Sequence, residues 1–328
     1  MMELDAQQQE WQEEFKAFVD REVAPHADRY DQQEQIPPEC ITQLAANGYL
    51  AATLPEQHGG RGMDMITYGL LCEQLGRSSC SVQSLVTVQN MVAQTILRWG
   101  SEQQKQRWLA AMASGEVIAA FALTEPNVGS DARNVELTAT LEGESYVLNG
   151  RKKWISFGQV ADVFLLLGQC DGQPCTFLVE KGTPGLVVRP IHGMLGFRAS
   201  MLAELHLDDC QVQKGNLIGG VGRGFFPVVL SALNIGRYSV AWGCVGLAQA
   251  CLDACIHHTS TREQFGVLLR EHQLIQRMLA DMIVGVRAAR MLCHQAGLSM
   301  IQAASDLVME IMIAKYFAST MASRTAND

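Results

Sequence analysis

A polar turn after a short apolar run is the first part of the sequence that could carry chemistry. Residues 117–123 are apolar, and residues 124–131 add two hydroxyls, a proline and a glycine. Hydroxyl and backbone N–H groups in such a loop can bind the polar edge of a ring or a phosphate. The same composition is typical of an ordinary turn at the end of a strand. The turn alone therefore leaves a binding loop and a structural turn both open.

An aromatic side chain and a further hydroxyl follow later in the sequence. Residues 153–156 (Lys-Trp-Ile-Ser) end a segment that reads as the second strand of a hairpin. A large flat cofactor that stacks on Trp154 would bring this segment and residues 124–131 into one site. A tryptophan taken by itself is more often part of a hydrophobic core.

Three other patterns point to no particular chemistry. Residues 219–224 are glycine-rich, but a Gly-x-Gly-x-x-Gly motif from Gly220 fails because position 225 is Phe. His257 and His258 are adjacent, so on a helix they point about 100° apart and cannot chelate one ion together. No serine lies in a Gly-x-Ser-x-Gly turn. We therefore expect no dinucleotide fingerprint, no metal site and no hydrolase triad.

Three stretches of different periodicity must position the residues of interest. Apolar residues recur at helical spacing up to about Gly115, where Ser101-x-x-Gln104 resembles a capping box. Short apolar runs separated by Gly and Pro turns then favour a barrel or sandwich over a doubly wound sheet. After Gly224 the helical period returns, and small residues such as Gly243 and Gly246 would let a neighbouring helix pack closely.

The expected fold is therefore mainly α with a central β domain. We predict an N-terminal α-helical domain over residues 1–115, a central β domain over 116–224 and a C-terminal α-helical domain over 225–328. The last domain looks incomplete, because nothing near Asp328 resembles a tail or a cap. We expect its C-terminal part to be truncated.

Composition restricts the class of protein. The 328 residues are 48% hydrophobic and 18% charged, which is typical of a globular chain. The net charge is −9 and the basic residues are dispersed, which argues against a nucleic-acid partner. Ten cysteines without a Cys-x-x-Cys indicate buried thiols. With no apolar signal segment and no continuous apolar run of about 18 residues, we expect a soluble, cytoplasmic protein without membrane contact.

Four motifs, in order along the chain, carry a resemblance to a known family. Residues 121–131 contain Thr-Glu-Pro-x-x-Gly-Ser-Asp, residues 149–154 contain Asn-Gly-x-Lys-x-Trp, and residues 154–156 are Trp-Ile-Ser. Residues 262–273 contain Arg-x-x-Phe-Gly-x-x-Leu-x-x-x-Gln. In this order the motifs resemble those of the FAD-dependent acyl-CoA dehydrogenases. The resemblance extends over nearly the whole chain and implies that family's three-domain fold.

The resemblance implies an FAD site on the central domain. Leu123, Thr124 and Ser130 would contact FAD, with the Thr124 hydroxyl near the pyrimidine side of the flavin and Ser130 near the pyrophosphate or the acyl chain. Trp154 would cover the flavin. Ser156 stands where Thr is commoner in the family, and its hydroxyl would bind near flavin N5.

A second group of residues would act across a subunit boundary. By the same resemblance, Arg262, Phe265 and Gln273 would reach the FAD of a neighbouring subunit, which implies a homodimer or homotetramer. The forked donors of Arg262 suit a pyrophosphate. An electron-transfer flavoprotein or oxygen would take the electrons from the flavin.

The resemblance also implies a carboxylate base. It would remove the α-proton of a thioester while a hydride leaves Cβ, and hydrogen bonds to the thioester carbonyl would stabilise the developing charge. Most members use a Glu in a Tyr-Glu-Gly-Thr-Ser segment, which lies beyond Asp328. A minority place it on the first long C-terminal helix, where this chain has Gly236 followed by Arg237. The catalytic base is therefore unknown here and expected in a missing C-terminal segment, with Arg237 as a candidate substrate contact.

A narrower resemblance bears on the substrate. Residues 236–246, with residues 261–266, look like the carrier-protein-specific dehydrogenases of polyketide extender-unit pathways. This implies oxidation of a short polar acyl group on an acyl carrier protein, in hydroxymalonyl- or methoxymalonyl-type biosynthesis. Tyr238 and Trp242 would narrow the pocket for such a group, or they belong to the core. The alternatives are a short-chain acyl-CoA dehydrogenase of fatty or branched-chain catabolism, and a non-catalytic flavin- or thioester-binding relative that lacks the base.

Overall fold

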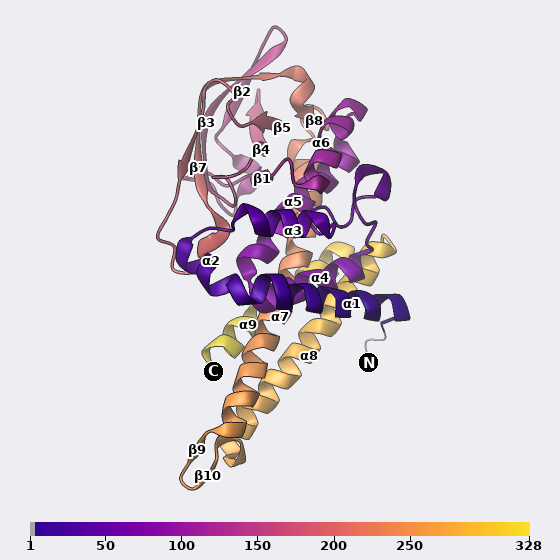
Figure 1. Ribbon diagram of the computed structural model, residues 1–328. Coiled ribbons are helices and arrows are strands. Elements are labelled where there is room, and N and C mark those ends of the chain that lie inside the picture. Colours follow the sequence, from indigo (N-terminus) through magenta and orange to yellow (C-terminus); the bar gives the residue numbers. More distant parts are fainter. Residues whose placement is uncertain (1–3) are drawn as a thin grey trace. The chain divides into compact units, whose positions relative to one another are not determined.

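The computed structural model describes residues 4–328, which form helices and strands in the order labelled in Figure 1. The helices are α1 (Ala6–Phe18), α2 (Ala27–Gln33), α3 (Pro38–Ala46), α4 (Met65–Ser78), α5 (Cys80–Trp99), α6 (Glu102–Ser114), α7 (Leu230–Thr261), α8 (Gln273–Ile301) and α9 (Leu307–Asn327). The strands are β1 (Ala119–Ala122), β2 (Thr138–Glu142), β3 (Ser145–Ile155), β4 (Val163–Cys170), β5 (Gln173–Glu180), β6 (Leu186–Pro190), β7 (Ala203–Gln213), β8 (Leu217–Ile218), β9 (Glu263–Gln264) and β10 (Val267–Leu268). The predicted order of helical, β and helical regions is confirmed.

The chain divides into two compact units, and both are assembled from separated stretches of sequence. The β unit comprises Asp28–Met63 and Ser84–Gly236. The helical unit comprises the chain up to Ala27, together with Asp64–Gln83 and Arg237–Asp328. Helix α7 begins in the β unit and continues into the helical unit, because the division falls between Gly236 and Arg237.

The sheet of the β unit is mixed but mainly antiparallel. Its strand order is β6-β7-β3-β2-β4-β5-β8, and β1 pairs in parallel with β4. The predicted hairpin joins β2 to β3, with Glu142 opposite Ser145 across a two-residue turn that contains Gly143 at φ +58°. A doubly wound parallel sheet is thus absent from the described residues, as the short apolar runs predicted.

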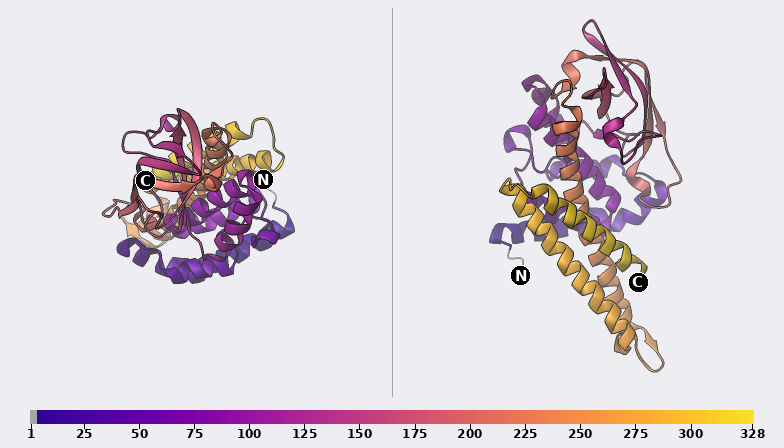
Figure 2. Two further views of the ribbon diagram at one scale, coloured as in Figure 1. Left: turned by 90° about the horizontal axis from the view of Figure 1, so that it is seen from above. Right: turned by 180° about the vertical axis from the view of Figure 1, so that it is seen from behind.

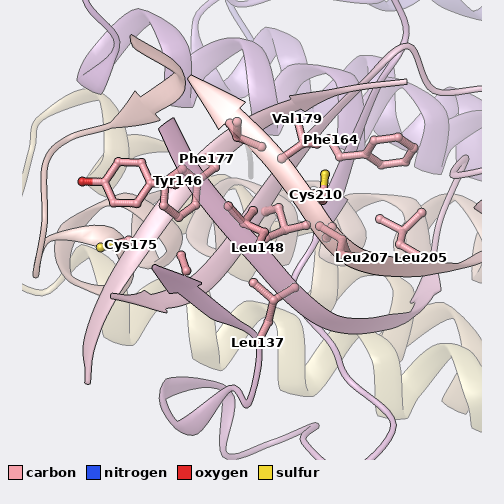
Figure 3. Packing of buried hydrophobic residues seen from close by; sticks show 14 of the residues in the cluster. Leu137, Tyr146, Leu148, Phe164, Cys175, Phe177, Val179, Leu205, Leu207 and Cys210 are labelled. Carbon is pink, nitrogen blue, oxygen red and sulfur yellow. The ribbon is translucent and has the colours of Figure 1, made fainter. Parts of the chain in front are cut away.

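The sheet curves over its own inner face. Strands β3 and β5 are not neighbours in the sheet, yet the rings of Tyr146 and Phe177 lie 5.0 Å apart between centroids. Figure 3 shows these rings among Leu148, Phe164 and other buried side chains of β2 to β7. Alternate residues of each strand supply this core, which accounts for the period-two pattern of the sequence.

The outer face of the sheet is covered by helices α5 and α6. Ile96 and Trp108 pack with Leu165 of β4 in a second buried cluster. Gln89 of α5 is fully buried, and its Nε2 donates to the carbonyls of Met112 (2.9 Å) and Val117 (2.7 Å). Its Oε1 accepts from the N–H of Ala119 at 2.8 Å. This amide holds the start of β1, and with it the polar turn that follows β1. The predicted capping box of α6 is also present at Ser101.

Close contact between α4 and α7 defines the core of the helical unit. A Cβ added to Gly246 would lie 1.9 Å from the carbonyl oxygen of Glu73, and one added to Gly76 would lie 2.5 Å from the carbonyl of Gly243. The backbones of the two helices therefore nearly touch, as the small residues predicted. Beside this crossing, the buried carboxylate of Glu73 accepts a hydrogen bond of 2.7 Å from Arg290 of α8.

Helices α7 and α8 run side by side in opposite directions and are joined by the β9–β10 hairpin (Figures 1 and 2). The stretch Gly224–Thr261 is long and apolar enough to cross a membrane by length and composition. Trp242 and Val245 on this stretch are fully buried within the chain. A core helix of a water-soluble protein has the same composition, so the stretch is weak evidence for a membrane span.

Candidate functional site

The two polar segments singled out in the sequence lie next to each other in the β unit. The backbone N–H of Lys153 donates to the carbonyl of Thr124 at 2.8 Å. The Nζ of Lys152 donates to the carbonyl of Leu123 at 3.0 Å. The turn after β1 is thus joined to the end of β3 by both main chain and side chain. Leu123 and Thr124 are partly exposed beside this junction.

A tight turn follows at residues 125–128. The N–H of Glu125 donates to the carbonyl of Val128 at 2.9 Å, and the N–H of Val128 donates back at 3.3 Å. Ser130 lies just beyond the turn and is exposed. A Cβ added to Gly129 would meet no atom within 4 Å, so the space beside Ser130 is open. The turn therefore presents a hydroxyl to the surface, as a binding loop requires.

Trp154 projects from a bulge in β3. The register with β7 shifts between Lys152, which pairs with Leu205, and Ile155, which pairs with Ala203. Within the bulge Trp154 has φ +61°, and its side chain is 49% exposed. Bulges and left-handed residues of this kind re-aim side chains and are common beside active sites. Trp154 is thus not a core residue, and Ser156 follows it with partial exposure.

A buried ion pair supports this junction between the turn after β1 and the end of β3. The Nζ of Lys152 lies 2.7 Å from Oε1 of Glu125, and their side chains are 0% and 1% exposed. Burial lowers the pKa of Lys152 to about 8, against the opposing effect of the Glu125 carboxylate. Neither residue has a role that its position in the sequence predicts. The available signal was the period-two pattern of β3. Lys152 lies an even number of residues after the buried Tyr146 and Leu148, so its side chain points to the same inner face of the sheet.

These groups suit the ring system of a flavin. An isoalloxazine has a flat face that can stack on an indole and a pyrimidine edge that exchanges hydrogen bonds. Trp154 offers an accessible indole, with Nζ of Lys153 lying 5.0 Å from its ring centroid. Thr124 and Ser156 offer hydroxyls that can donate or accept. The residues of the β unit therefore fit the cofactor that the sequence implied.

The second predicted group lies on the helical unit, at the α7–α8 connection. Arg262 follows the last residue of α7, Phe265 occupies the turn between β9 and β10, and Gln273 is the first residue of α8. All three are exposed, Phe265 to 96%, and Phe265 has φ +56°. Carbonyl groups of the connection are engaged locally, since that of Arg262 accepts from the N–H of Leu269 at 2.9 Å. The three side chains are thus free of the core and available to another molecule.

Gly236 and Arg237 lie in α7. A Cβ added to Gly236 would lie 2.7 Å from Sδ of Met91, so a side chain there would have to displace this methionine. Burial lowers the pKa of Arg237 below the usual arginine value.

The next turns of α7 settle the role of two bulky residues. The hydroxyl of Tyr238 donates to the carbonyl of Met65 at 2.6 Å. The indole of Trp242 packs on Gly69, where an added Cβ would lie 2.3 Å from Nε1. Both side chains are fully buried. They belong to the core of the helical unit, which was the second of the two readings of these residues.

Models of one protein family match most of the chain. The N-terminal domain of acyl-CoA dehydrogenases matches residues 5–116, the middle domain matches residues 120–210, and the C-terminal domain matches residues 222–328. A probable acyl-CoA dehydrogenase of Bacillus subtilis, YngJ, is 36% identical over 332 residues, or 99% of this chain and 87% of that protein. The mitochondrial short-chain specific acyl-CoA dehydrogenase of Rattus norvegicus is 35% identical over 303 residues, covering 90% of this chain and 73% of the relative.

Solved structures agree with the family models. A glutaryl-CoA dehydrogenase from Mycobacterium smegmatis in complex with FADH2 has a TM-score of 0.91 at 30% identity, covering 98% of this chain and 84% of that one. FkbI, described as serving biosynthesis of the methoxymalonyl extender unit of the polyketide FK520, has a TM-score of 0.87 at 31% identity, with coverage of 96% and 86%. The chain therefore belongs to the acyl-CoA dehydrogenase family, the FAD-dependent oxidoreductases that act on the CH–CH bond of acyl thioesters.

Proposed function

We propose that the protein oxidises a short polar acyl group held as a thioester on an acyl carrier protein, in the supply of hydroxymalonyl- or methoxymalonyl-type extender units. The observation that carries this proposal is the likeness to FkbI over 96% of the chain. The resemblance of residues 236–246 to carrier-protein-specific dehydrogenases is in line with it.

The β unit binds the flavin in this proposal. Trp154 covers the ring system from its bulge, and Thr124 and Ser156 exchange hydrogen bonds with the ring edge. Leu123 and Ser130 complete the contacts along the same turn. When bound, FAD accepts the hydride that leaves Cβ of the acyl group. The Ser156 hydroxyl would hydrogen-bond near N5 and help to hold the ring in position relative to the substrate.

The helical unit completes the cofactor site of a second subunit. Arg262, Phe265 and Gln273 project from the α7–α8 connection, and we assign them to the FAD of a partner chain in a homodimer or homotetramer. The guanidinium of Arg262 suits the pyrophosphate through paired N–H donors. An electron-transfer flavoprotein is the proposed electron acceptor.

The proton chemistry needs a carboxylate, and Gly236 cannot supply one. Arg237, which follows it on α7, is our candidate for a contact with the thioester substrate. A guanidinium removed from bulk water attracts an anionic or carbonyl oxygen more strongly than an exposed one does. A substrate oxygen near Arg237 would therefore be held firmly while the α-proton leaves.

A second candidate function is oxidation of a short-chain acyl-CoA. The 35% identity to the rat short-chain enzyme favours it. The two candidates differ in both the acyl group and its carrier. Four substrates separate them: a glyceryl and a butyryl group, each attached to an acyl carrier protein and to coenzyme A.

The test is anaerobic reduction of the bound flavin by each thioester. The reduction is monitored as loss of the visible absorption of the flavin. The proposal expects the glyceryl carrier-protein thioester to reduce the flavin fastest. Fastest reduction by butyryl-CoA would instead identify the short-chain activity. Because no carboxylate base is identified in the chain, a flavin that stays oxidised with all four thioesters in both the native protein and Gly236→Glu would indicate a non-catalytic flavin-binding relative.

A pair of matched variants checks the site itself. Ser156→Thr keeps the hydroxyl, whereas Ser156→Ala removes it. Loss of one hydrogen bond of about 1.4 kcal/mol corresponds to about a tenfold lower rate of flavin reduction. We expect that loss in Ser156→Ala and a near-native rate in Ser156→Thr. Equal rates of flavin reduction in both variants would show that the Ser156 hydroxyl does not act on the flavin.

A further inference from the structure

The ion pair between Glu125 and Lys152 is buried completely, and that is costly. The desolvation of two charges often cancels their attraction, so replacing such a pair by apolar residues is frequently neutral or stabilising. A contribution to stability is therefore a weak explanation for the presence of this ion pair. The groups around it show what else it does.

Each charge has defined partners. The Glu125 carboxylate accepts hydrogen bonds from the backbone N–H groups of Glu136 and of Leu137, the latter at 3.0 Å, as well as from Lys152. The Lys152 ammonium divides its donors between Glu125 at 2.7 Å and the carbonyl oxygen of Leu123 at 3.0 Å. The ammonium is thus the charge in direct contact with the Leu123–Thr124 peptide, and the carboxylate lies behind it.

The Leu123–Thr124 peptide transmits the electrostatic effect of the ammonium toward the exposed side of the turn. In a trans peptide the C=O and N–H groups point in opposite directions. An ammonium on the carbonyl of Leu123 therefore leaves the N–H of Thr124 pointing away from Lys152. A hydrogen bond at the carbonyl also polarises the peptide and strengthens its N–H as a donor. Thr124 is partly exposed, whereas Lys152 is fully buried.

We propose that Lys152 and Glu125 are positioning residues that tune the bound flavin through the Leu123–Thr124 peptide. This inference rests on the proposed function, because it takes Thr124 to lie at the pyrimidine edge. Negative charge accumulates at that edge when a flavin is reduced. The polarised N–H of Thr124 stabilises this charge and raises the midpoint potential of the flavin, with Lys152 as the source and Glu125 as the counter-charge.

The direction in which two substitutions shift the midpoint potential distinguishes this role from mere support of the loop. Lys152→Met keeps the length of the side chain and removes the positive charge, so the flavin potential should fall. Glu125→Gln keeps the shape and removes the counter-charge. The Glu125 carboxylate also opposes the lowering of the Lys152 pKa by burial, so the potentials are compared at about pH 6, which keeps the ammonium charged, and there the potential should rise. A purely structural pair would loosen the turn in both variants and shift the potential in the same direction, or in neither.

The experiment measures the midpoint potential of FAD bound to each full-length variant by equilibration with a reference dye. FAD affinity and the unfolding of the protein are measured alongside. Glu180→Gln is the matched control, because Glu180 forms an exposed pair with Arg107 at 2.6 Å on the same unit. It should leave the potential unchanged. Lys152→Met leaves a buried carboxylate unpaired, so the double variant Lys152→Met/Glu125→Gln is included in case the single variant does not fold.

The expected order of potentials is Glu125→Gln above the native protein, and the native protein above both Lys152→Met and the double variant. If Lys152→Met fails to fold, the comparison of Glu125→Gln with the double variant decides. Shifts in one direction, or no shifts with FAD still bound, would overturn the inference. FAD that is bound but reduced by no thioester, in the native protein and in Gly236→Glu alike, would instead contradict the proposed function, and the potentials would still test the inference.

Discussion

The α4–α7 crossing makes Gly246→Ala a sharp test of the helical unit. The added methyl would lie 1.9 Å from the carbonyl oxygen of Glu73 and 2.7 Å from the backbone nitrogen of Arg77. Both atoms belong to the backbone of α4, so no side chain can rotate away. Ordinary contact begins at 3.4 Å, and the helices would have to separate by about 1.5 Å to reach it.

The magnitude follows from two opposing effects. Overpacking in a tight contact costs about 1–3 kcal/mol, and a clash with backbone belongs at the top of that range or above it. Alanine in place of a helical glycine returns about 1 kcal/mol of helix propensity. We therefore expect Gly246→Ala to lose about 2 kcal/mol or more of the free energy of unfolding.

A matched glycine on α8 provides the control. A Cβ added to Gly285 would lie 2.9 Å from Cγ of Met321, a flexible side chain that can move. The same gain in helix propensity applies, so Gly285→Ala should stay within about 1 kcal/mol of the native protein. Urea unfolding of both variants, followed by circular dichroism, measures the difference. Equal midpoints for Gly246→Ala and Gly285→Ala would refute the close backbone contact described here.

Three further outcomes are expected. Trp154→Ala should weaken FAD binding by about tenfold or more through loss of ring stacking, and Trp154→Phe should weaken it less; flavin fluorescence measures both. Gly236→Glu places a carboxylate on α7 and should speed exchange of the thioester α-proton by about 100-fold or more over Gly236→Gln, as measured by deuterium incorporation. Folding lowers the pKa of Lys152 from 10.5 to about 8, so between these values the unfolded chain holds a proton that the folded chain has released. The free energy of unfolding, relative to Lys152→Met/Glu125→Gln, should therefore rise with pH above about 8 by at most about 1.4 kcal/mol per pH unit and be flat below it. An unchanged difference across pH 7 to 10 would contradict the lowered pKa.

Local features of the fold were predictable because local rules fix them. Ser101 and Gln104 predicted a capping box, and the two side chains satisfy the first N–H groups of α6 as expected. The turn between Glu142 and Ser145 predicted a hairpin, and its register follows from that turn. Small residues at Gly243 and Gly246 predicted a close helix contact. The capping box and the hairpin depend on residues within a few positions of each other, whereas the small residues indicate a close contact without specifying α4 as its partner.

Features that depend on distant partners were not predictable. Periodicity shows that Lys152 faces inward, but the carboxylate that receives it comes from Glu125 on another segment. Similarly, Glu34 reaches across the sequence to pair with Arg198 at 2.9 Å, and no local pattern specifies that partner. Trp154 was open to two readings because its exposure depends on a bulge, which is a mismatch between β3 and β7 and cannot be seen in either strand alone.

The interleaved composition of the two units has a consequence for synthesis on the ribosome. The β unit is complete once Gly236 has been made, whereas the helical unit needs residues from both ends of the described chain. Domains fold as units while the chain emerges, so the β unit can fold while α1 and α4 still lack α8 and α9. During that interval the apolar face of α4, including Leu70 and Leu71, has no partner from the later helices. We expect nascent chains halted shortly after Gly236 to bind chaperones through α4, and chains extended past α9 to release them.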